Sequence, residues 1–251
     1  MKQTKNIHKN FKVHESFLDD IIVNFDSKGT DYGDQKRNSL KTFELQGKTL
    51  NVKSFRVPNV INKIAYNYFR KSKAQRSFEY AKKLQDLNIG TPQPIAYYEY
   101  NHLGLFDKSY YISEQLECDL TYRELINDFN YPDYDTILRA FTRFTYNLHE
   151  KGVQFLDHSP GNTLIKKIGD KYEFYLVDLN RMKFGTMDFE TRMKNFSRLS
   201  KHKHMVEIMS DEYAKCCDKT YDEVFGLMWK EVKSFRESVQ RKKNLKRRFK
   251  I

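Results

Sequence analysis

The sequence predicts an α+β fold in two parts, followed by a basic tail. Short stretches with apolar residues at alternate positions prevail in residues 1–116, where one helix interrupts them, and apolar residues at helical spacing prevail in residues 117–240. The first part is therefore expected to be an antiparallel sheet with one helix, and the second part to be mainly helical. Residues 241–251 form the tail. Of the 251 residues, 39% are hydrophobic, which suits one large or two small domains with a substantial core.

Three strands are expected at the start of the first part. They cover Asp20–Asp26, Leu40–Gln46 and Leu50–Val57. Gly47 and Lys48 suit a tight turn between the second and the third strand. The polar loop after the first strand contains Gly29 and Gly33. Its backbone N–H groups either cover phosphate groups or belong to a flexible hairpin, and these residues alone leave both interpretations open.

Lys53 lies in the third of these strands, between apolar residues, and a helix is expected after it over residues 72–88. Glu79 lies one residue off the apolar stripe of this helix. It can pair with Lys82 or Lys83 of the same helix, which would stabilise the helix by about 0.2–0.5 kcal/mol. It can also pair with Lys53, which would then hold the α- and β-phosphates of a nucleotide. We favour Lys53, because the strand precedes the helix in the order that this pairing needs.

Two further strands, over Ile95–Tyr100 and Ser109–Gln115, complete the first part, and Gln115 and Leu116 lead into the second. Helices are then expected from about Thr121, from Asp133, and over Phe189–Ser200, Asp211–Cys217 and Tyr221–Gln240.

The stretch from residue 153 to residue 182 carries the residues best suited to chemistry. Asp157 and Asn162 lie in a short loop, and the two apolar runs that follow, Asn162–Ile168 and Phe174–Val177, predict a β-hairpin. The hairpin returns Asp178 to the loop. Two carboxylates and an amide carbonyl offer the oxygen ligands that suit Mg²⁺, and one spare carboxylate suits a base for an incoming hydroxyl group.

The order and spacing of these residues match the catalytic segment of kinases. There an Asp precedes a metal-binding Asn by five residues, and a hairpin leads on to a second metal-binding Asp. Asp157, Asn162 and Asp178 keep this pattern, with Pro160 in between. The alternative is an ordinary loop with a turn-forming Asp, an Asn cap and an Asp that ends a strand. Each residue alone favours the ordinary loop, but the ordered set favours the kinase-like interpretation.

The charge of the chain is concentrated at one end. The formal net charge is +12, and residues 241–250 contain seven Lys and Arg and no acidic residue, which leaves +5 for the rest by subtraction. Anionic lipid, nucleic acid or solubility would each explain this excess. No nucleic-acid motif accompanies it, so no nucleic-acid partner is expected. Three cysteines without a CxxC pattern indicate a reducing compartment such as the cytoplasm.

On these motifs the chain resembles the lipopolysaccharide kinase family, within the protein-kinase-like fold. It is most similar in kind to the 3-deoxy-D-manno-octulosonic acid (Kdo) and core-heptose kinases of Gram-negative bacteria. The motifs are VKSF with Lys53, SKAQRSFEYA with Glu79, DHSPGN with Asp157 and Asn162, and VDLNR with Asp178, between about Arg37 and Leu199. The resemblance implies a two-lobed fold, with residues 1–116 as a nucleotide-covering lobe and residues 117–240 as the lobe that carries the catalytic and metal-binding loops.

The resemblance also implies ATP and Mg²⁺ as cofactors. In the implied arrangement Lys53 and Glu79 hold the phosphates, Gln115 and Leu116 hold the adenine, Asp157 activates or orients the acceptor hydroxyl, and Asn162 and Asp178 hold Mg²⁺.

The chain departs from protein kinases at several positions. Phe155 stands in place of the His of His-Arg-Asp, Ser159 in place of a Lys, and Asn180 in place of the Gly of Asp-Phe-Gly, and no Ala-Pro-Glu segment follows. These departures argue against a standard protein kinase. A protein kinase, another small-molecule kinase and a kinase-shaped binding module without activity remain the alternatives, although the intact catalytic residues speak against the last.

The acceptor implied by the resemblance is a Kdo hydroxyl group of lipid A-linked inner core, at the cytoplasmic face of the inner membrane. A core heptose, another sugar or a protein hydroxyl are the alternatives. Arg181, Arg192 and Arg198 are candidates to bind carboxylate and phosphate groups of this acceptor. The basic tail suits peripheral attachment to an anionic inner leaflet, and its alternative is a disordered tail that confers solubility.

Overall fold

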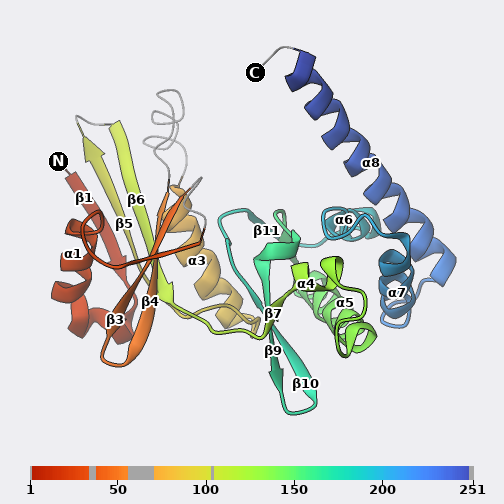
Figure 1. Cartoon of the computed structure of the whole chain (residues 1–251), viewed down its shortest axis with the longest axis horizontal. Coiled ribbons are helices and arrows are strands. Elements are labelled where there is room, and N and C mark those ends of the chain that lie inside the picture. The colour runs from red at the N-terminus through yellow and green to blue at the C-terminus, as the bar shows by residue number, and fades with distance from the viewer. Residues whose placement is uncertain (1, 34–37, 56–70, 103–104, 249–251) are drawn as a thin grey trace. The chain divides into compact units, whose positions relative to one another are not determined.

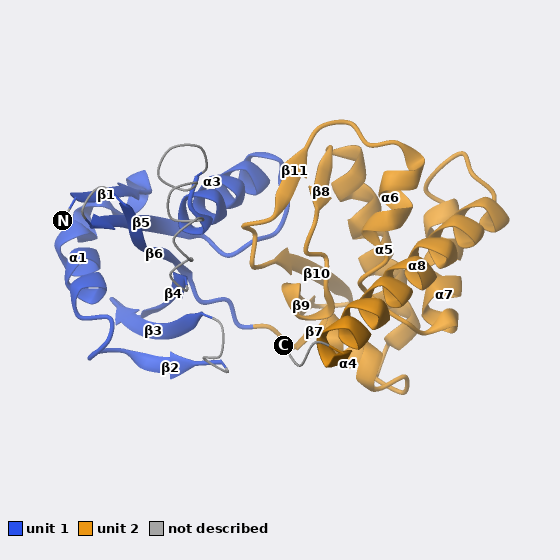
Figure 2. Ribbon diagram, turned by 90° about the horizontal axis from the view of Figure 1, so that it is seen from above, with its two compact units in different colours: residues 1–117 blue, residues 118–251 orange. Residues whose placement is uncertain are grey.

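The computed structural model describes residues 2–33, 38–55, 71–102 and 105–248. The chain divides into two compact units, unit 1 (residues 1–117) and unit 2 (residues 118–251) (Figure 2). The boundary expected from the sequence lay one residue earlier. Residues 241–251, which we expected to form a separate tail, fall within unit 2.

Unit 1 is built on a six-stranded sheet with the strand order β1-β5-β6-β4-β3-β2, in which every neighbouring pair is antiparallel (Figure 1). The strands are β1 (Lys2–Ile7), β2 (Thr30–Tyr32), β3 (Ser39–Leu45), β4 (Lys48–Phe55), β5 (Pro94–His102) and β6 (Leu105–Glu114). The helices are η1 (Lys9–His14), α1 (Glu15–Val23) and α3 (Lys73–Asp86). Residues 56 and 57, the end of the third expected strand, lie outside the described residues.

The sheet of unit 1 carries a helix on each face (Figure 1). Leu50 and Val52 of β4 are buried in the cluster that includes the apolar residues of α1. Phe55 of the same strand is buried against Phe78 of α3. Because side chains alternate between the two faces along a strand, Lys53 lies on the α3 face together with Phe55.

The first expected strand, Asp20–Asp26, is wrong, because α1 covers the first part of this stretch. Leu18, Ile21 and Ile22 are buried at spacings of three and four residues, which is the period of a helix and not the alternation of a strand. The sequence also did not predict β1. Among the described strands this one lies at the edge of the sheet and pairs with β5 alone. Its sequence KQTKNI is largely exposed and lacks an apolar pattern.

Two local signals fix the ends of β4 and α3. Gln46 and Gly47 have φ angles of 49° and 78°, as the two-residue turn of a hairpin requires, so the turn lies one position before the predicted Gly47-Lys48. The Ser72 hydroxyl accepts a hydrogen bond from the backbone N–H of Gln75 at 3.0 Å, which caps α3. These ends position the strand and the helix that carry two of the predicted site residues.

Unit 2 is mainly helical, with small sheets that hold its loops. The helices are α4 (Tyr122–Asn127), α5 (Tyr134–Glu150), η2 (Pro160–Asn162), α6 (Phe189–Asn195), α7 (Lys203–Ala214) and α8 (Tyr221–Arg248). The strands are β7 (Leu120–Thr121), β8 (Val153–Phe155), β9 (Thr163–Ile168), β10 (Lys171–Leu176) and β11 (Met182–Phe184). β9 and β10 form the expected hairpin, and β8 pairs with β11.

The core of unit 2 forms around the apolar stripe that the sequence predicts for α5. Ile137, Phe141 and Leu148 of this stripe are fully buried. Phe144 is half-buried and stacks on Phe174 of β10, with ring centroids 5.3 Å apart. The helix thereby anchors the hairpin that carries the candidate catalytic residues at its ends.

Helix α8 continues beyond its predicted end at Gln240 as far as Arg248. Its last residues, 241–248, are all exposed, so the described part of the basic tail is a helical extension (Figure 1). None of the helices that the structure describes combines the length and the apolar character needed to cross a bilayer.

Candidate active site

The two-stranded sheet β8–β11 anchors the loop that carries Asp157. Gly152, just before β8, and Gly185, just after β11, approach closely: Gly185 N donates to Gly152 O at 2.9 Å. A Cβ atom on Gly152 would lie 2.9 Å from Gly185 O, and Gly152 has a φ of 67°, so only glycine fits without strain. The close approach fixes where the candidate catalytic loop begins.

The loop from Asp157 to Asn162 is a tight turn held by hydrogen bonds. Ser159 N and Asn162 Nδ2 both donate to Asp157 O, at 2.7 and 2.8 Å. Asn162 N donates to Ser159 O at 2.9 Å. Because the amide nitrogen of Asn162 is used within the loop, its Oδ1 atom is the one that remains to face a cation.

Asp178 joins this loop because two backbone hydrogen bonds tie its segment to Leu156 and Asn162. Val177 N donates to Asn162 O, and Leu156 N donates to Arg181 O, both at 3.0 Å. Asp178 itself has a left-handed φ of 58°, a conformation that Asp adopts more readily than most residues and that often marks a functional site. Asn180 Nδ2 donates to Asp178 Oδ1 at 2.7 Å, so the residue that replaces the kinase glycine orients the carboxylate.

The oxygen atoms at this site fit a magnesium ion better than a metal that prefers nitrogen or sulfur. Among the described residues, no group of three or more His, Cys, Asp and Glu side chains comes together as a ready metal site. Mg²⁺ does not need such a group, because it usually keeps several waters and binds one or two protein oxygens plus substrate phosphates. The Asp178 carboxylate and the Asn162 carbonyl meet this need.

Two of the three predicted arginines reach Asp157. Arg198 Nη2 lies 2.8 Å from Asp157 Oδ1, and Arg181 Nη1 lies 3.9 Å from Asp157 Oδ2. Arg192 instead forms an ion pair with Glu150. No contact between Arg192 and Asp157 is found in the part of the chain that the structure describes.

Arg123 lies at the loop although the sequence analysis did not single it out. This exposed residue of α4 places its guanidinium group against Gly161, where an added Cβ atom would come within 2.6 Å of Nη2. Thr121 and Glu124 form a capping box that fixes the first turn of α4. The capping-box pattern and the glycine are both visible in the sequence, but only the fold brings them together.

His158 follows Asp157 in the sequence and supports the loop from within the core. Its ring is fully buried between those of Phe141 and Phe155, with centroid distances of 5.4 and 5.7 Å. Burial lowers the pKa of His158 to about 3. The imidazole therefore stays neutral at physiological pH and is not a proton carrier there.

His149, near the end of α5, is also buried and connects to the segment that precedes the loop. Its ring nitrogens lie 3.0 Å from Tyr213 Oη and 3.2 Å from Asn195 Oδ1. Asn195 Nδ2 in turn donates to Phe155 O at 2.7 Å, just before the loop from Asp157 to Asn162. Burial lowers the pKa of His149 to about 4, so this chain of hydrogen bonds involves a neutral histidine.

In unit 1 the structure gives Glu79 a partner that the sequence analysis did not consider. Lys71 Nζ lies 2.7 Å from Glu79 Oε2, and Gln75 Nε2 donates to Glu79 Oε1 at 3.0 Å. Lys53 lies on the α3 face of β4, with its Nζ atom 5.3 Å from the centroid of the Phe55 ring. The described contacts therefore join Glu79 to Lys71 and do not join it to Lys53.

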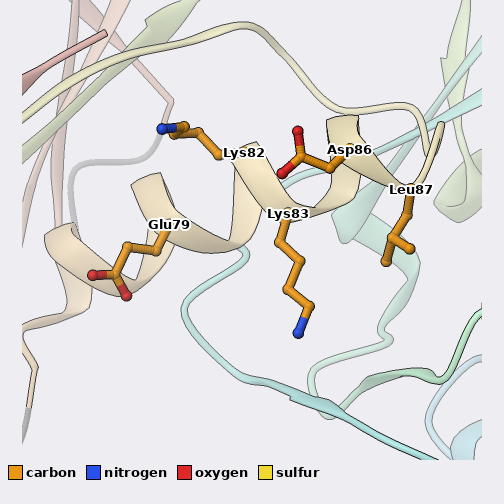
Figure 3. A pocket seen from close by; sticks show the side chains of 5 residues that line it. All are labelled: Glu79, Lys82, Lys83, Asp86 and Leu87. Atoms are coloured by element: carbon orange, nitrogen blue, oxygen red, sulfur yellow. The ribbon is translucent and has the colours of Figure 1, made fainter.

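The same acidic residue borders an open pocket along α3. Its lining residues are Glu79, Lys82, Lys83, Asp86 and Leu87. In Figure 3 neither the Lys82 nor the Lys83 ammonium group is directed at the Glu79 carboxylate. The alternative pairing within the helix is thus not formed among these side chains.

Gln115 and Leu116 lie at the end of unit 1, directly after β6. Gln115 N donates to Thr49 O at 2.8 Å, and its side-chain oxygen accepts a hydrogen bond from Asn51 Nδ2 at 2.6 Å. Gln115 is therefore fixed to β4, the strand that carries Lys53. Leu116 is half-buried.

The model of the lipopolysaccharide kinase (Kdo/WaaP) family matches residues 26–219. A search of curated protein sequences finds no match. The solved structure of WaaP in complex with acyl carrier protein is similar at a TM-score of 0.62 and 16% identity, over 94% of this chain and 99% of that chain. The MAP kinase LmaMPK10 from Leishmania major gives a TM-score of 0.49 and 15% identity, over 85% of this chain and 66% of that chain.

The likeness to WaaP shows the fold, an α+β kinase-like architecture with an antiparallel sheet in its N-terminal unit and a mainly helical C-terminal unit. The family model spans more than half of the chain, and its range includes Lys53, the loop from Asp157 to Asn162, and Asp178. The predicted fold class and the resemblance are both confirmed: the chain belongs to the lipopolysaccharide kinase (Kdo/WaaP) family.

Proposed function

We propose that this protein transfers the γ-phosphoryl group of ATP to a hydroxyl group of Kdo in lipid A-linked inner core. Membership of the lipopolysaccharide kinase family supports a phosphotransferase of the lipopolysaccharide core. The observation that carries the proposal is the loop from Asp157 to Asn162, tied by hydrogen bonds to the segment of Asp178. One carboxylate for an incoming hydroxyl group and two oxygen ligands for a cation then belong to two segments that backbone hydrogen bonds join.

In the proposed reaction Asp157 accepts a hydrogen bond from the acceptor hydroxyl group and orients its oxygen for attack on the γ-phosphorus. The hydroxyl proton passes to the Asp157 carboxylate as the bond from oxygen to phosphorus forms and the bond to the ADP oxygen breaks. Arg198 holds one oxygen atom of Asp157 at 2.8 Å, which favours a fixed orientation of the carboxylate. Positioning of this kind is the main contribution that a kinase makes to phosphoryl transfer.

Mg²⁺ would be held by Asn162 and Asp178, whose side-chain oxygen atoms are of the kind that this ion prefers. When bound, the ion would neutralise charge on the β- and γ-phosphates. Lys53 and Glu79 would hold the α- and β-phosphates, and Gln115 and Leu116 would hold the adenine. This use of Glu79 requires that Lys53 replaces Lys71 as its partner.

The acceptor carries carboxylate and phosphate groups, and exposed arginines at the loop suit them. Arg181 has an exposed side chain 3.9 Å from Asp157, and Arg123 is exposed against Gly161. Planar guanidinium groups bind such anions through paired hydrogen bonds. We therefore assign acceptor binding to Arg181 and Arg123, and regard Arg192, which pairs with Glu150, as the weakest of the earlier candidates.

The helical extension of α8 suits an anionic membrane surface at the cytoplasmic face of the inner membrane. Its exposed cations are Arg241, Lys242, Lys243, Lys246, Arg247 and Arg248. Each cation near such a surface contributes about 1 kcal/mol, and Leu245, with 53% of its surface exposed, offers an apolar contact. The WaaP structure contains acyl carrier protein, so a protein partner on this helix is the second candidate.

Mass spectrometry of Kdo-lipid A after incubation with ATP and Mg²⁺ tests the reaction. A gain of one phosphoryl group on the Kdo unit supports the proposal, and Asp157→Asn serves as the negative control. Heptose-containing core and a generic protein substrate are incubated in parallel. Phosphorylation of one of these, without any gain on Kdo, would retain a kinase and reject this acceptor.

Sedimentation with vesicles tests the membrane contact. Replacement of the six cations of residues 241–248 by Gln keeps a good helix former at each position. We expect the variant to lose sedimentation with anionic vesicles, and the unchanged protein to lose it as salt rises. Binding that is indifferent to salt and to these replacements would contradict the electrostatic account.

A further inference from the structure

We propose that Phe235 of α8 is a positioning residue, which holds Arg198 against Asp157 and thereby orients the carboxylate that receives the acceptor hydroxyl group. The kinetic part of this proposal rests on the proposed function. The contact itself is a feature of unit 2 alone and is testable without any reaction.

Arg198 links the helix to the loop through two contacts. Its Nη2 atom lies 2.8 Å from Asp157 Oδ1, and its guanidinium carbon lies 5.5 Å from the centroid of the Phe235 ring. A guanidinium group within about 6 Å of an aromatic ring is attracted by the electrons of the ring face. The ring therefore constrains the same group that binds the carboxylate.

Within the described part of the chain, the Nε atom of Arg198 contributes no hydrogen bond that would fix the orientation of the guanidinium group, so we assign this role to the Phe235 ring. This Nε atom is buried and has no hydrogen-bond partner among the described residues. Arg181 is too far from Asp157, at 3.9 Å, to form a hydrogen bond of normal length. Among the described residues Arg198 thus makes the one close ionic contact to the Asp157 carboxylate, and Phe235 limits the orientation of Arg198.

Phe235 lies on α8 close in sequence to residues of the core. Met228 and Val232 of α8 are buried in the central cluster of unit 2. Phe235 follows Val232 by three residues, so it lies on the same side of the helix. A second guanidinium group, that of Arg236, lies 5.9 Å from the centroid of the same ring, which increases the positive charge gathered at this point.

The same helix supplies a matched control. Phe225 is half-buried, and Lys203 Nζ lies 5.5 Å from the centroid of its ring. This pair has the same kind of cation–ring contact, but neither residue has a described contact with Asp157. Phe225→Leu and Phe235→Leu remove similar rings from one helix and differ in their connection to the loop.

The kinetic experiment compares these variants with Phe235→Tyr, which keeps the ring. We expect Phe235→Leu to lower kcat by about twofold to thirtyfold, the range that cation–ring contacts span, and to leave KM for ATP unchanged. Phe235→Tyr should keep most of the activity, and Phe225→Leu should not change kcat. In an Arg198→Met background, Phe235→Leu should have no further effect. Equal losses for the Phe225 and Phe235 variants would overturn the proposal.

A double-mutant cycle separates this proposal from the proposed function. The unfolding midpoint in urea is measured for Phe235→Leu, for Asp157→Asn and for the two changes together. If Phe235 acts on Asp157 through Arg198, the shift of the urea midpoint in the double variant should differ from the sum of the shifts in the two single variants. Additive shifts would overturn the proposed role of Phe235 even if the enzyme is active. Non-additive shifts would support this role even if no phosphoryl group reaches Kdo.

Discussion

The two units hold their candidate catalytic residues in different ways. In unit 2, Asn162 donates to Asp157 O, Asn180 donates to Asp178, and the neighbouring backbone segments are joined by hydrogen bonds. In unit 1, Glu79 is joined to Lys71, a residue whose side chain is 58% exposed. The residues of unit 2 are thus fixed by the fold of their loop, whereas Glu79 is fixed by a surface ion pair.

The difference indicates how firmly each unit holds its own candidate residues. An exposed ion pair contributes about 0–1 kcal/mol and exchanges partners at little cost. A turn held by several hydrogen bonds to backbone groups resists rearrangement, because each lost partner costs about 1–3 kcal/mol when buried. We infer that the residues for the acceptor are ready in unit 2, and that the phosphate-binding pair of unit 1 forms when nucleotide binds.

The largest effect on kcat is expected from a change of Asp157, in the loop of unit 2 that hydrogen bonds fix. Asp157→Asn keeps the shape of the side chain but cannot accept the hydroxyl proton, so kcat should fall by about 10²–10⁴. Affinity for ATP, measured by calorimetry, should stay the same. Asp170→Asn, in the exposed turn between β9 and β10, removes an equal charge outside the site and should leave kcat unchanged. An active Asp157→Asn enzyme would remove Asp157 from the mechanism.

The next effect tests the exchange of partners in unit 1. If Glu79 turns from Lys71 to Lys53 when ATP binds, Lys53→Met should lower kcat by about 10²–10³, as does the loss of one donor to a developing charge. Lys71→Met breaks the pair that the structure contains and should leave activity near normal. Circular dichroism should show both proteins folded. The reverse ranking of the two variants would assign the phosphates to Lys71.

A smaller effect is expected on the affinity for Mg-ATP. Asp178→Asn removes an ionic ligand, and interactions with a charged group contribute about 1.5–3 kcal/mol, so Kd should rise by about tenfold or more. Asp157→Asn should change this Kd little, because Asp157 faces the acceptor in our assignment. Calorimetry with Mg-ATP on the two variants makes the comparison. Indistinguishable Kd values would contradict the division of roles between the two aspartates.

The elements with a clear period could be predicted from the sequence. The stripe of α5 and the hairpin β9–β10 are confirmed, because each extends over enough residues to reveal its period. The short apolar run at residues 21–23 was assigned to a strand, although it belongs to α1, because three apolar residues in succession fit either structure. β1 shows no alternation of apolar and polar residues, because it is largely exposed and buries little apolar surface.

The placement of the candidate site residues was predictable where they are close in sequence. Asp157, Asn162 and Asp178 meet because a loop and a hairpin join them, and both have local signals. The contacts of Arg123 with Gly161 and of Arg198 with Phe235 join segments that are distant in the sequence, so no local sequence pattern predicts them. The partner of Glu79 could not be predicted from the order of strand and helix alone. This order favours Lys53, but it does not exclude Lys71, which is the cation that pairs with Glu79 in the structure.

The last expected effect concerns the stability of unit 2, not its activity, and is a response to acid. Unit 2 buries His149 and His158, and burial lowers their pKa values to about 4 and about 3. In the unfolded chain a histidine takes up a proton near pH 6.5. Below that pH the unfolded state binds protons that the folded state does not, so stability is full above pH 6.5 and falls as the pH decreases toward 4. Each buried histidine should contribute a slope of about 1.4 kcal/mol per pH unit.

Trp229 makes this slope measurable in unit 2, because it is the one tryptophan of the chain and packs against the core of that unit. We expect urea unfolding followed by its fluorescence to show decreasing stability from pH 6.5 to pH 4.5. His158→Met removes one titrating group but keeps an apolar side chain in the core, so its slope should be about half as steep. His102→Gln, at an exposed position of unit 1, should leave the slope unchanged. A slope that persists undiminished in His158→Met would mean that this histidine is already protonated in the folded protein, and would contradict its role as a neutral support of the loop from Asp157 to Asn162.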